Sequence, residues 1–464
     1  MIRRSKAVVL TEGSILQGLL RLALPTIGTS FVQMAYGFID MIWVGRLGSG
    51  AVAAVGTAGF FTWLAHAFII IPRIGAEVGV AQSIGRQDRE GAAKAIRHSL
   101  QLIVVLSVLY AAALVALREP LLGFYRLGAE IQGLASTYLT IICYGMVFFA
   151  ANPVFTAIFN GAGDSTTPFR INALGLVANI ILDPIFIFGL GPIPEMGVAG
   201  AAVATVLAQL LATGAFVLEA RKRPELFAGL KPFAKPDWAY LKGMVIMGLP
   251  MAVQNALFTS ISMGIARIIS AWGPLAIAVQ KVGSQIESIS WMTAGGFQSA
   301  MSAFSGQNYG AKKGQRVYRG YYVGLGIVSC IGFAATAALI FAARPLISIF
   351  LHEPEAIALG VAYLRILGIS QLPQTVEILT AGAFIGLGRT APPSIVGISL
   401  NLFRIPAALI LSATALNLDG VWWAISISSI LKGIILSTWY LRFMNRDQEM
   451  LNLRAASTAQ EGIK

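Results

Sequence analysis

The sequence predicts an all-α polytopic membrane protein with twelve transmembrane helices, arranged as two pseudo-symmetric six-helix bundles around a central cavity. Of its 464 residues, 56% are hydrophobic and only 12% are charged, whereas a soluble protein carries about twice that charged fraction. The apolar runs divide into twelve stretches that are each long enough to cross roughly 30 Å of hydrocarbon. Similar sequence features also recur in the two halves. No large soluble domain is left over.

One polar segment, residues 221–239, divides the predicted spans into two sets of six. It reads RKRPELFAGLKPFAKPDWA, and its three prolines and clustered cations are typical of a connection outside the membrane. We therefore expect a tail over 1–13, a first lobe over 14–220, this linker, a second lobe over 240–443 and a tail over 444–464. The spans are expected at 14–45, 51–82, 97–118, 130–160, 167–190, 196–220, 240–270, 275–305, 319–342, 355–386, 392–416 and 419–443.

The basic residues indicate which way the chain crosses the membrane. Of the 34 Lys and Arg residues, 23 lie in or beside the tails and connections on one side, and only four lie beside those on the other. Basic residues concentrate on the cytoplasmic side of membrane proteins, so both termini are expected in the cytoplasm. This placement explains the net charge of +13 without a nucleic-acid partner.

The two halves share sequence features at a nearly constant spacing. LALPTIGTSFVQ at 22–33 matches MGLPMAVQNALF at 247–258, and FNGAGDSTTPF at 159–169 matches FIGLGRTAPPS at 384–394, with the same offset in numbering for both pairs. NIILDP at 179–184 matches NLFRIP at 401–406 at a slightly smaller offset. Because a unit of six spans enters and leaves on the same side, the halves are predicted to be parallel repeats that enclose a cavity.

Asp40 is a lone carboxylate within the first predicted span. A charged side chain in a membrane helix is costly unless it faces a polar cavity, which makes Asp40 a candidate functional residue. Gln33 and Tyr36 precede it on the same helical face, so these three side chains are expected to line a cavity together. Pro25 lacks an amide proton, so the helix can kink or straighten there. The alternative is a structural hydrogen-bonding cluster with an ordinary proline kink.

A second intramembrane acid, Asp183, lies in the fifth span, one helical turn after Asn179. Thr205 in the sixth span can add a hydroxyl. Carboxylate, amide and hydroxyl oxygens are hard donors that suit a proton or a small cation such as Na⁺. Two acids that are withdrawn from water and close together take up a proton or cation more readily, which would link ion binding to the packing of the first lobe. In the alternative, Asp183 only caps a broken helix.

Other kinds of site find little support in the sequence. Cys143 and Cys330 both fall within predicted spans, and the histidines His66, His98 and His352 are scattered, which argues against disulfides and zinc. The chain has no Gly-Lys dipeptide, so a P-loop for ATP cannot be written. No cofactor is expected. An enzyme would need a nucleophile with its base or a metal cluster, and duplicated halves around one acidic site suit alternating access better than a channel.

Seven short stretches form a characteristic combination. They are DMIWVGRLG (40–48), VAAVG (52–56), AQSIGRQDREGAAKA (81–95), GAGDSTTP (161–168), NIILDP with FGLGP (179–192), GVAGAAVAT (197–205) and GQNYGAKKGQ (306–315). Together they resemble the multidrug and toxic compound extrusion (MATE) family over residues 14–443. The prokaryotic branch related to the DNA-damage-inducible F transporters is the most similar, because the acids lie in the first and fifth spans.

The resemblance implies a two-lobed antiporter in the prokaryotic plasma membrane that expels amphipathic, often cationic drugs or toxic metabolites in exchange for protons or sodium ions. A monomer surrounded by membrane lipid is expected, and the proline that bends the first span in this branch corresponds to Pro25. The cation site of this branch maps onto Asp40, Asn179, Asp183 and Thr205, where a bound Na⁺ is one option, and its substrate-facing residues map onto Gln33, Tyr36 and Asn152.

Glu377, in the tenth span, aligns with Asn152 at the offset of the first two matches and is a further candidate for the cavity or for a second coupling site. The alternative is an ion pair, since buried charges usually find partners. Its potential partners are Lys281, Arg404 and Lys432. The second function considered is a flippase for a lipid or lipid-linked oligosaccharide, which would need inward-pointing basic residues such as Arg267, Lys281 and Arg404.

Overall fold

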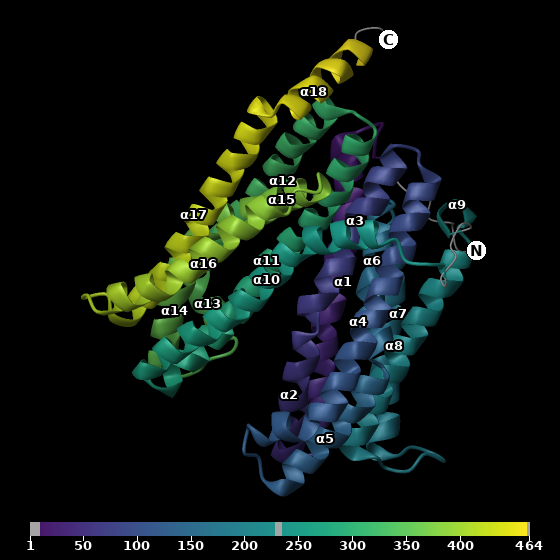
Figure 1. Cartoon of the computed structure of the whole chain (residues 1–464). Coiled ribbons are helices and arrows are strands. Elements are labelled where there is room, and N and C mark those ends of the chain that lie inside the picture. The colour runs from purple at the N-terminus through teal and green to yellow at the C-terminus, as the bar shows by residue number, and fades with distance from the viewer. Residues whose placement is uncertain (1–9, 228–233, 462–464) are drawn as a thin grey trace. The chain divides into compact units, whose positions relative to one another are not determined.

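The computed structural model describes residues 10–227 and 234–461, and all regular structure in these ranges is helical (Figure 1). The chain divides into two compact units. Of the described residues, the first unit comprises 28–227 and 234–248, and the second comprises 10–27 and 249–461. Residues 1–9 of the predicted N-terminal tail, 228–233 of the predicted linker and 462–464 of the predicted C-terminal tail lie outside the described residues.

Long helices, some joined by short ones, make up both units. The helices before the linker are α1 (Ile15–Gly45), α2 (Ser49–Leu64), α3 (His66–Gly85), α4 (Arg89–Gly123), α5 (Ala129–Tyr144), α6 (Met146–Gly161), α7 (Thr166–Phe188), α8 (Gly197–Arg221) and α9 (Pro224–Phe227). Those after it are α10 (Trp238–Ile269), η1 (Ser270–Trp272), α11 (Pro274–Gly310), α12 (Gly314–Phe341), α13 (Ala343–Ser348), α14 (Pro354–Ile369), α15 (Gln371–Gly386), α16 (Ala391–Ser412), α17 (Asn417–Arg446) and α18 (Gln448–Glu461).

Among the described residues, nine helical stretches are long and apolar enough to cross a membrane, and two bent helix pairs raise the number to eleven. The remaining long helix at a predicted span is α11, which has 37 residues. Its many serines, glutamines and glycines make it more polar than the other spans. The predicted helical, multi-pass membrane fold is confirmed.

Three predicted spans are interrupted, and two of them are sharply bent. The span at 51–82 is interrupted at Ala65 between α2 and α3, the span at 130–160 bends by 52° at Gly145, and the span at 355–386 bends by 47° at Ser370. A Cβ atom at Gly145 would overlap Val206 of α8, so glycine lets α8 pack against this bend. Apolar composition continues on both sides of each break, which is why hydropathy did not reveal them.

The same close helix–helix contact occurs once in each of the two repeats. A Cβ atom at Gly161 of α6 would lie 2.6 Å from the carbonyl oxygen of Glu77 on α3. In the second unit, a Cβ atom at Gly386 of α15 would overlap the carbonyl oxygen of Ser302 on α11. The two glycines are separated by the offset of the repeat, and so are the two residues that supply the carbonyls. Small residues let membrane helices approach closely, so glycine is required at both positions.

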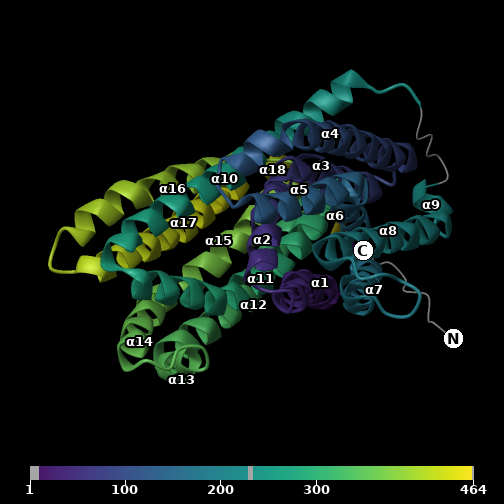
Figure 2. The same ribbon diagram turned by 90° about the horizontal axis from the view of Figure 1, so that it is seen from below.

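A second pair of close contacts follows the same rule. A Cβ atom at Gly200 of α8 would overlap the carbonyl oxygen of Phe186 on α7, and one at Gly420 of α17 would overlap the carbonyl group of Leu411 on α16. Figures 1 and 2 show α7 beside α8 and α16 beside α17, as the contacts within each unit require. The helix that carries Asn179 and Asp183 is therefore held tightly against α8.

An ion pair and hydrogen bonds hold the end of the linker against the first unit. Lys94 Nζ on α4 lies 2.6 Å from Asp237 Oδ2, and the backbone N–H of Asp237 donates to His98 Nε2 at 3.0 Å. The side chain of Gln101 donates to the carbonyl of Ala234 at 3.0 Å. The hydrogen bond from Lys94 is the main reason that the pKa of the Asp237 carboxyl is lowered. The chain that enters α10 is thus held against α4.

The second unit fastens the segment before α1 in the same manner. Lys313 Nζ donates to the carbonyl of Thr11 at 2.8 Å, and the Arg316 guanidinium donates to the carbonyl of Glu12 at 2.8 Å. Glu12 and Asp237 are also separated by the offset of the repeat. The two sets of polar contacts therefore occupy equivalent positions in the two repeats. Each long helix that opens a repeat, α1 or α10, accordingly begins in one unit and continues in the other.

Four helices lie wholly or mainly where the sequence predicted connections or tails: the short α9, η1 and α13, and the longer α18. Between the ninth and tenth predicted spans, α13 covers six residues, and most of the predicted C-terminal tail forms α18. The α18 helix packs against α12, and the guanidinium of Arg454 lies 3.9 Å from the ring centroid of Tyr318. Because α18 is polar and α13 is short, neither has the long apolar run from which spans were predicted.

Candidate functional site

The predicted oxygen donors of the first unit meet between α1 and α7. Asn179 Nδ2 donates to Asp183 Oδ1 at 3.0 Å, one helical turn apart on α7, and both side chains are buried. The carboxyl group of Asp40 on α1 is a neighbour of both side chains and interacts with them electrostatically. Asp40 itself is only partly buried. The structure therefore brings together three of the four predicted ligands.

Three oxygen atoms of this cluster have no hydrogen-bond donor among the described residues. They are Asp40 Oδ1, Asn179 Oδ1 and Asp183 Oδ2, and each is shielded from solvent. Buried polar oxygens normally have a partner, so three such atoms together need a chemical explanation. A proton shared between the acids, or a small cation held by all three, would satisfy them.

Thr205, the fourth predicted ligand, has a different environment. Its hydroxyl donates to the carbonyl of Ala201 at 2.9 Å, one turn earlier on α8, and lies within reach of the phenol of Tyr138. Tyr138 on α5 is buried and close to both Asp40 and Asp183. Sequence reasoning missed Tyr138 because the spans contain many tyrosines and its neighbours give it no distinguishing pattern. Thr205 approaches the acids through this phenol.

A cavity of about 310 Å³ in the first unit lies beside this cluster, and of the three clustered residues only Asp40 contributes to its wall. Five predicted residues contribute to its wall: Gln33, Tyr36, Asp40, Asn152 and Thr205. The rest of the wall was not predicted and includes several aromatic rings. The unpredicted polar and aromatic lining residues are Thr62, Trp63, His66, Tyr138, Phe149, Asn172 and Gln209. One carboxylate among aromatic faces suits an organic cation, because such rings attract positive charge.

Asn152 lines the cavity, but its side-chain amide already forms hydrogen bonds within the protein. Its Nδ2 donates to Gln209 Oε1 at 2.7 Å and to the Gln209 carbonyl at 3.1 Å, while its Oδ1 accepts from the Thr213 hydroxyl at 2.8 Å. Asn152 is 3% exposed. These bonds tie the bent α5–α6 span to α8, so Asn152 shapes the cavity wall and offers little free hydrogen-bonding capacity to a substrate.

Glu377, also a predicted cavity residue, belongs to the second unit and does not line the cavity of the first. Glu377 Oε2 lies 3.2 Å from Lys432 Nζ on α17, which is one of the three ion-pair partners considered from the sequence. Another of those three, Arg404, donates to Ser428 Oγ at 2.6 Å and to Ser429 Oγ at 3.0 Å. These buried charges of the second unit are thus paired or hydrogen-bonded.

Pro25 lies inside α1, which continues through it as a helix. Within α1, the boundary between the second unit and the first lies between Ile27 and Gly28, two residues after Pro25. A Cβ atom at Gly28 would overlap the ring of Phe169 on α7. The predicted bending residue therefore lies next to the place where α1 first meets the helix of Asn179 and Asp183.

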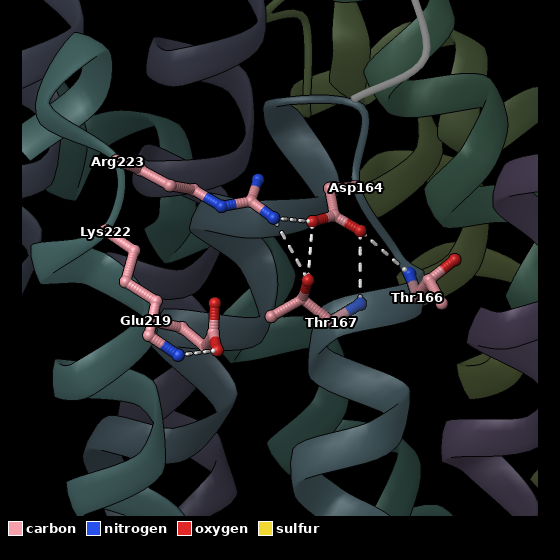
Figure 3. A network of polar contacts seen from close by, with 6 residues as sticks. All are labelled: Asp164, Thr166, Thr167, Glu219, Lys222 and Arg223. Atoms are coloured by element: carbon pink, nitrogen blue, oxygen red, sulfur yellow. Dashed lines mark hydrogen bonds and ion pairs between the residues drawn. The ribbon is translucent and has the colours of Figure 1, made fainter. Parts of the chain in front are cut away.

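Asp164, in the turn before α7, fixes the start of the helix that carries two of the candidate ligands (Figure 3). Its Oδ1 accepts hydrogen bonds from the backbone N–H groups of Thr166 and Thr167, both at 3.1 Å, as a helix-capping side chain does. Arg223, just beyond α8, forms an ion pair with Asp164 and donates to the Thr167 hydroxyl at 3.1 Å. The Arg223 guanidinium also lies 5.1 Å from the ring centroid of Phe159. This cluster ties together α6, α7 and the end of α8.

The second unit has an ion pair of opposite polarity at the equivalent turn. Arg389, which takes the place of Asp164 in the second repeat, lies 3.8 Å from Asp447 and 3.4 Å from Glu449. Its guanidinium is 4.7 Å from the ring centroid of Phe443. Sequence reasoning used GAGDSTTP only as a family motif and missed the role of its aspartate, although the charge reversal between the repeats was a signal.

The comparisons with known proteins agree with this description. The family model described as MatE matches the chain twice, at residues 25–185 and 250–410, so the two matches are separated by the same offset as the repeated motifs. The "probable multidrug resistance protein NorM" of Thermotoga maritima is 32% identical over 411 residues, which covers 87% of each chain. The "FAD transporter" of Shewanella oneidensis is 27% identical over 434 residues and covers 90% of this chain and 92% of its own.

A solved structure has the same fold. It is the outward-facing conformation of a multidrug resistance MATE family transporter of the MOP superfamily, and it superposes with a TM-score of 0.84 at 26% identity, covering 97% of this chain and 99% of that one. The predicted family resemblance is confirmed by the repeated match of the family model and by the relative at 32% identity. The chain therefore belongs to the multidrug and toxic compound extrusion (MATE) family.

Proposed function

We propose that this chain is a secondary active transporter, and not an enzyme, that exports amphipathic, often cationic organic compounds in exchange for protons or sodium ions. The observation that carries the proposal is the trio of shielded oxygens on Asp40, Asn179 and Asp183 that have no donor among the described residues. Such a trio binds a proton or a small hard cation well and binds little else. Asp40, one of the three, also lines the cavity, which links ion binding to the space where cargo would sit.

The coupling follows from the charge of the two acids. When Asp40 and Asp183 are both ionised, they repel each other and oppose close packing of α1 on α7. A proton or sodium ion removes that repulsion and competes with a cationic cargo for the same carboxylates. Export then results if the ion is taken up on the outside and cargo on the inside, with alternating access between the two lobes.

The nature of the cavity wall favours small organic cations over lipid head groups. Among the described residues, the wall contains Asp40 but no lysine or arginine. The flippase alternative requires inward-pointing basic residues, whereas Arg404 is engaged by two serines and Arg267 donates to Ser270 Oγ at 3.1 Å. The name of the Thermotoga relative supports drug export. The name of the Shewanella relative adds a larger, anionic compound to the cargoes worth testing.

The cellular setting is part of the proposal. We place the transporter in the prokaryotic plasma membrane as a monomer with both termini in the cytoplasm, because basic residues concentrate in the connections on that side. No cofactor is required, since the ion gradient supplies the energy.

The deciding experiment is export of a fluorescent organic cation from proteoliposomes, with a pH gradient and a sodium gradient imposed separately. We expect export to respond to at least one gradient and to be abolished by Asp40→Asn and by Asp183→Asn in protein that still inserts. Glu130→Gln, an exposed acid in the same unit, is the matched control and should transport as the wild type does. Wild-type export by both aspartate variants, or a response to neither gradient, would refute the proposal.

A further inference from the structure

His66 is an ionisable residue of the cavity that neither the sequence analysis nor the proposed coupling uses. It is the first residue of α3, directly after the break at Ala65, and its side chain lines the same cavity as Asp40 and Tyr36. A histidine there brings a side chain that can gain a positive charge into a space that suits cations.

The orientation of the His66 ring is fixed by two contacts. Its Nδ1 lies 3.1 Å from the carbonyl oxygen of Trp63, and the ring meets Phe149 edge to face at 5.5 Å between centroids. A carbonyl oxygen only accepts hydrogen bonds, so Nδ1 must carry a proton. In the neutral ring the lone pair is therefore on Nε2, and in the charged ring both nitrogens carry protons. Protonation changes the Nε2 side from an acceptor to a positively charged donor.

The other charged and ionisable groups around His66 come from three further helices and from its own. Asp40 and Tyr36 of α1 and Tyr138 of α5 line the cavity, and Asp183 of α7 interacts with Asp40 and Tyr138 without lining it. The lining from α2, α6 and α8 is uncharged. Arg73, two turns later on α3, acts on the imidazole as a positive charge. Within the cavity lining that the structure describes, His66 is the one group that can become positive without binding a cation.

We propose that His66 sets the charge of the cargo that the cavity accepts. Its neutral form offers Nε2 to an N–H group of a protonated amine and leaves the acids to neutralise the cargo. Its protonated form adds a fixed positive charge that competes with organic cations for the same carboxylates, so cationic cargo is released or refused in acidic conditions. This inference rests on the proposed export of organic cations.

The test is the binding of a fluorescent, permanently charged organic cation to the purified full-length protein in detergent, from about pH 8 down to about pH 5. Protonation of Asp40 and Asp183 weakens binding in every variant, so the informative quantity is the ratio of the Kd of the wild type to that of His66→Phe. Phenylalanine keeps an aromatic ring against Phe149 but cannot be charged. We expect the ratio to rise by about tenfold between the two ends of the range, since one additional charge acts through a partly shielded cavity.

Two further variants separate charge from shape. His66→Lys carries a permanent positive charge and should bind the cationic probe weakly throughout the range, whereas His352→Gln in the second unit should follow the wild type. A ratio that stays constant with pH, or a His66→Lys variant that binds like the wild type, would overturn the inference. Failure of the proposed function is a separate result, because it would appear as ion-coupled export by Asp40→Asn whatever His66 does.

Discussion

Glu377 Oε2 lies 3.2 Å from Lys432 Nζ inside the second unit, and both side chains are buried. Nothing equivalent is found in the lining of the first unit's cavity as described, where Asp40 lies near Asp183 and no lysine or arginine contributes to the wall. The buried carboxylate of Glu377 is thus compensated by a side chain, whereas the proposed function has the acids of the first unit compensated by a cation or proton from solution. Under the proposed function, this asymmetry would confine ion coupling to the first unit although the fold is duplicated.

If Lys432 is a structural counter-ion, its removal should destabilise the protein by leaving a buried carboxylate unpaired. Lys432→Met is expected to lower stability by about 3–5 kcal/mol, whereas the double variant Glu377→Gln with Lys432→Met should recover most of the loss. Thermal unfolding of the purified protein measures both. A double variant that is no more stable than Lys432→Met would show that the pair does not act as a unit.

Asn179 should matter for ion affinity more than for folding. Asn179→Ala removes one of the three free oxygens and the hydrogen bond that orients Asp183 Oδ1. Losing an orienting partner typically weakens ion binding by about tenfold or more. We expect a correspondingly higher proton or sodium concentration for half-maximal transport, with expression close to that of the wild type. An unchanged ion dependence would remove Asn179 from the site.

The repeated glycine contacts lead to a prediction with internal controls. Gly161→Ala and Gly386→Ala each place a methyl group against a backbone carbonyl that cannot move independently of its helix. Overpacking of this kind costs about 1–3 kcal/mol or more. Gly214 and Gly326 lie on helices of the same two units with no neighbouring atom near the added Cβ, so their alanine variants should unfold at or above the wild-type temperature. Equal behaviour of the two pairs would contradict the close contacts.

Much of the architecture could be predicted from the sequence because it depends on composition and spacing. Apolar runs give the spans, and the constant offset between matching motifs gives the two repeats, down to Gly161 with Gly386. The acids of the site were found because a charge in an apolar helix is conspicuous. Tyr138 and His66 were missed since their importance depends on which helix face turns inward, and a single sequence does not distinguish that face among many aromatic residues.

The contacts of Asp164 could likewise be predicted only in part from the sequence. Its position in a turn before a helix is a recognisable capping pattern, but its pairing with Arg223 joins residues 59 positions apart. Asp164→Ala should lower stability by about 3–5 kcal/mol, because it removes a helix cap and leaves a largely buried arginine without its partner. The equivalent Arg389→Ala should cost less than about 1 kcal/mol, since that pair is more exposed. Thermal unfolding of the two variants side by side tests the difference, and equal losses would contradict it.

The contacts that hold the end of the linker against α4 should weaken at acidic pH, because they include the carboxylate of Asp237. The pKa of its carboxyl is lowered, chiefly by the hydrogen bond from Lys94, so the folded arrangement favours the ionised form. The stabilisation is therefore present above the ordinary carboxyl pKa of about 4 and is lost as the pH falls through the lowered value. Pulsed hydrogen exchange of the peptide around residues 234–241, corrected for the intrinsic effect of pH, should show weaker protection in that acidic range.

Two variants test whether Asp237 is the group responsible. Asp237→Asn should show the weaker protection already at neutral pH and little further change on acidification. Glu219→Gln, which disturbs the exposed pair with Lys222 at 2.7 Å, should leave this peptide unaffected. If acidification affects the wild type and Asp237→Asn alike, another group holds the end of the linker.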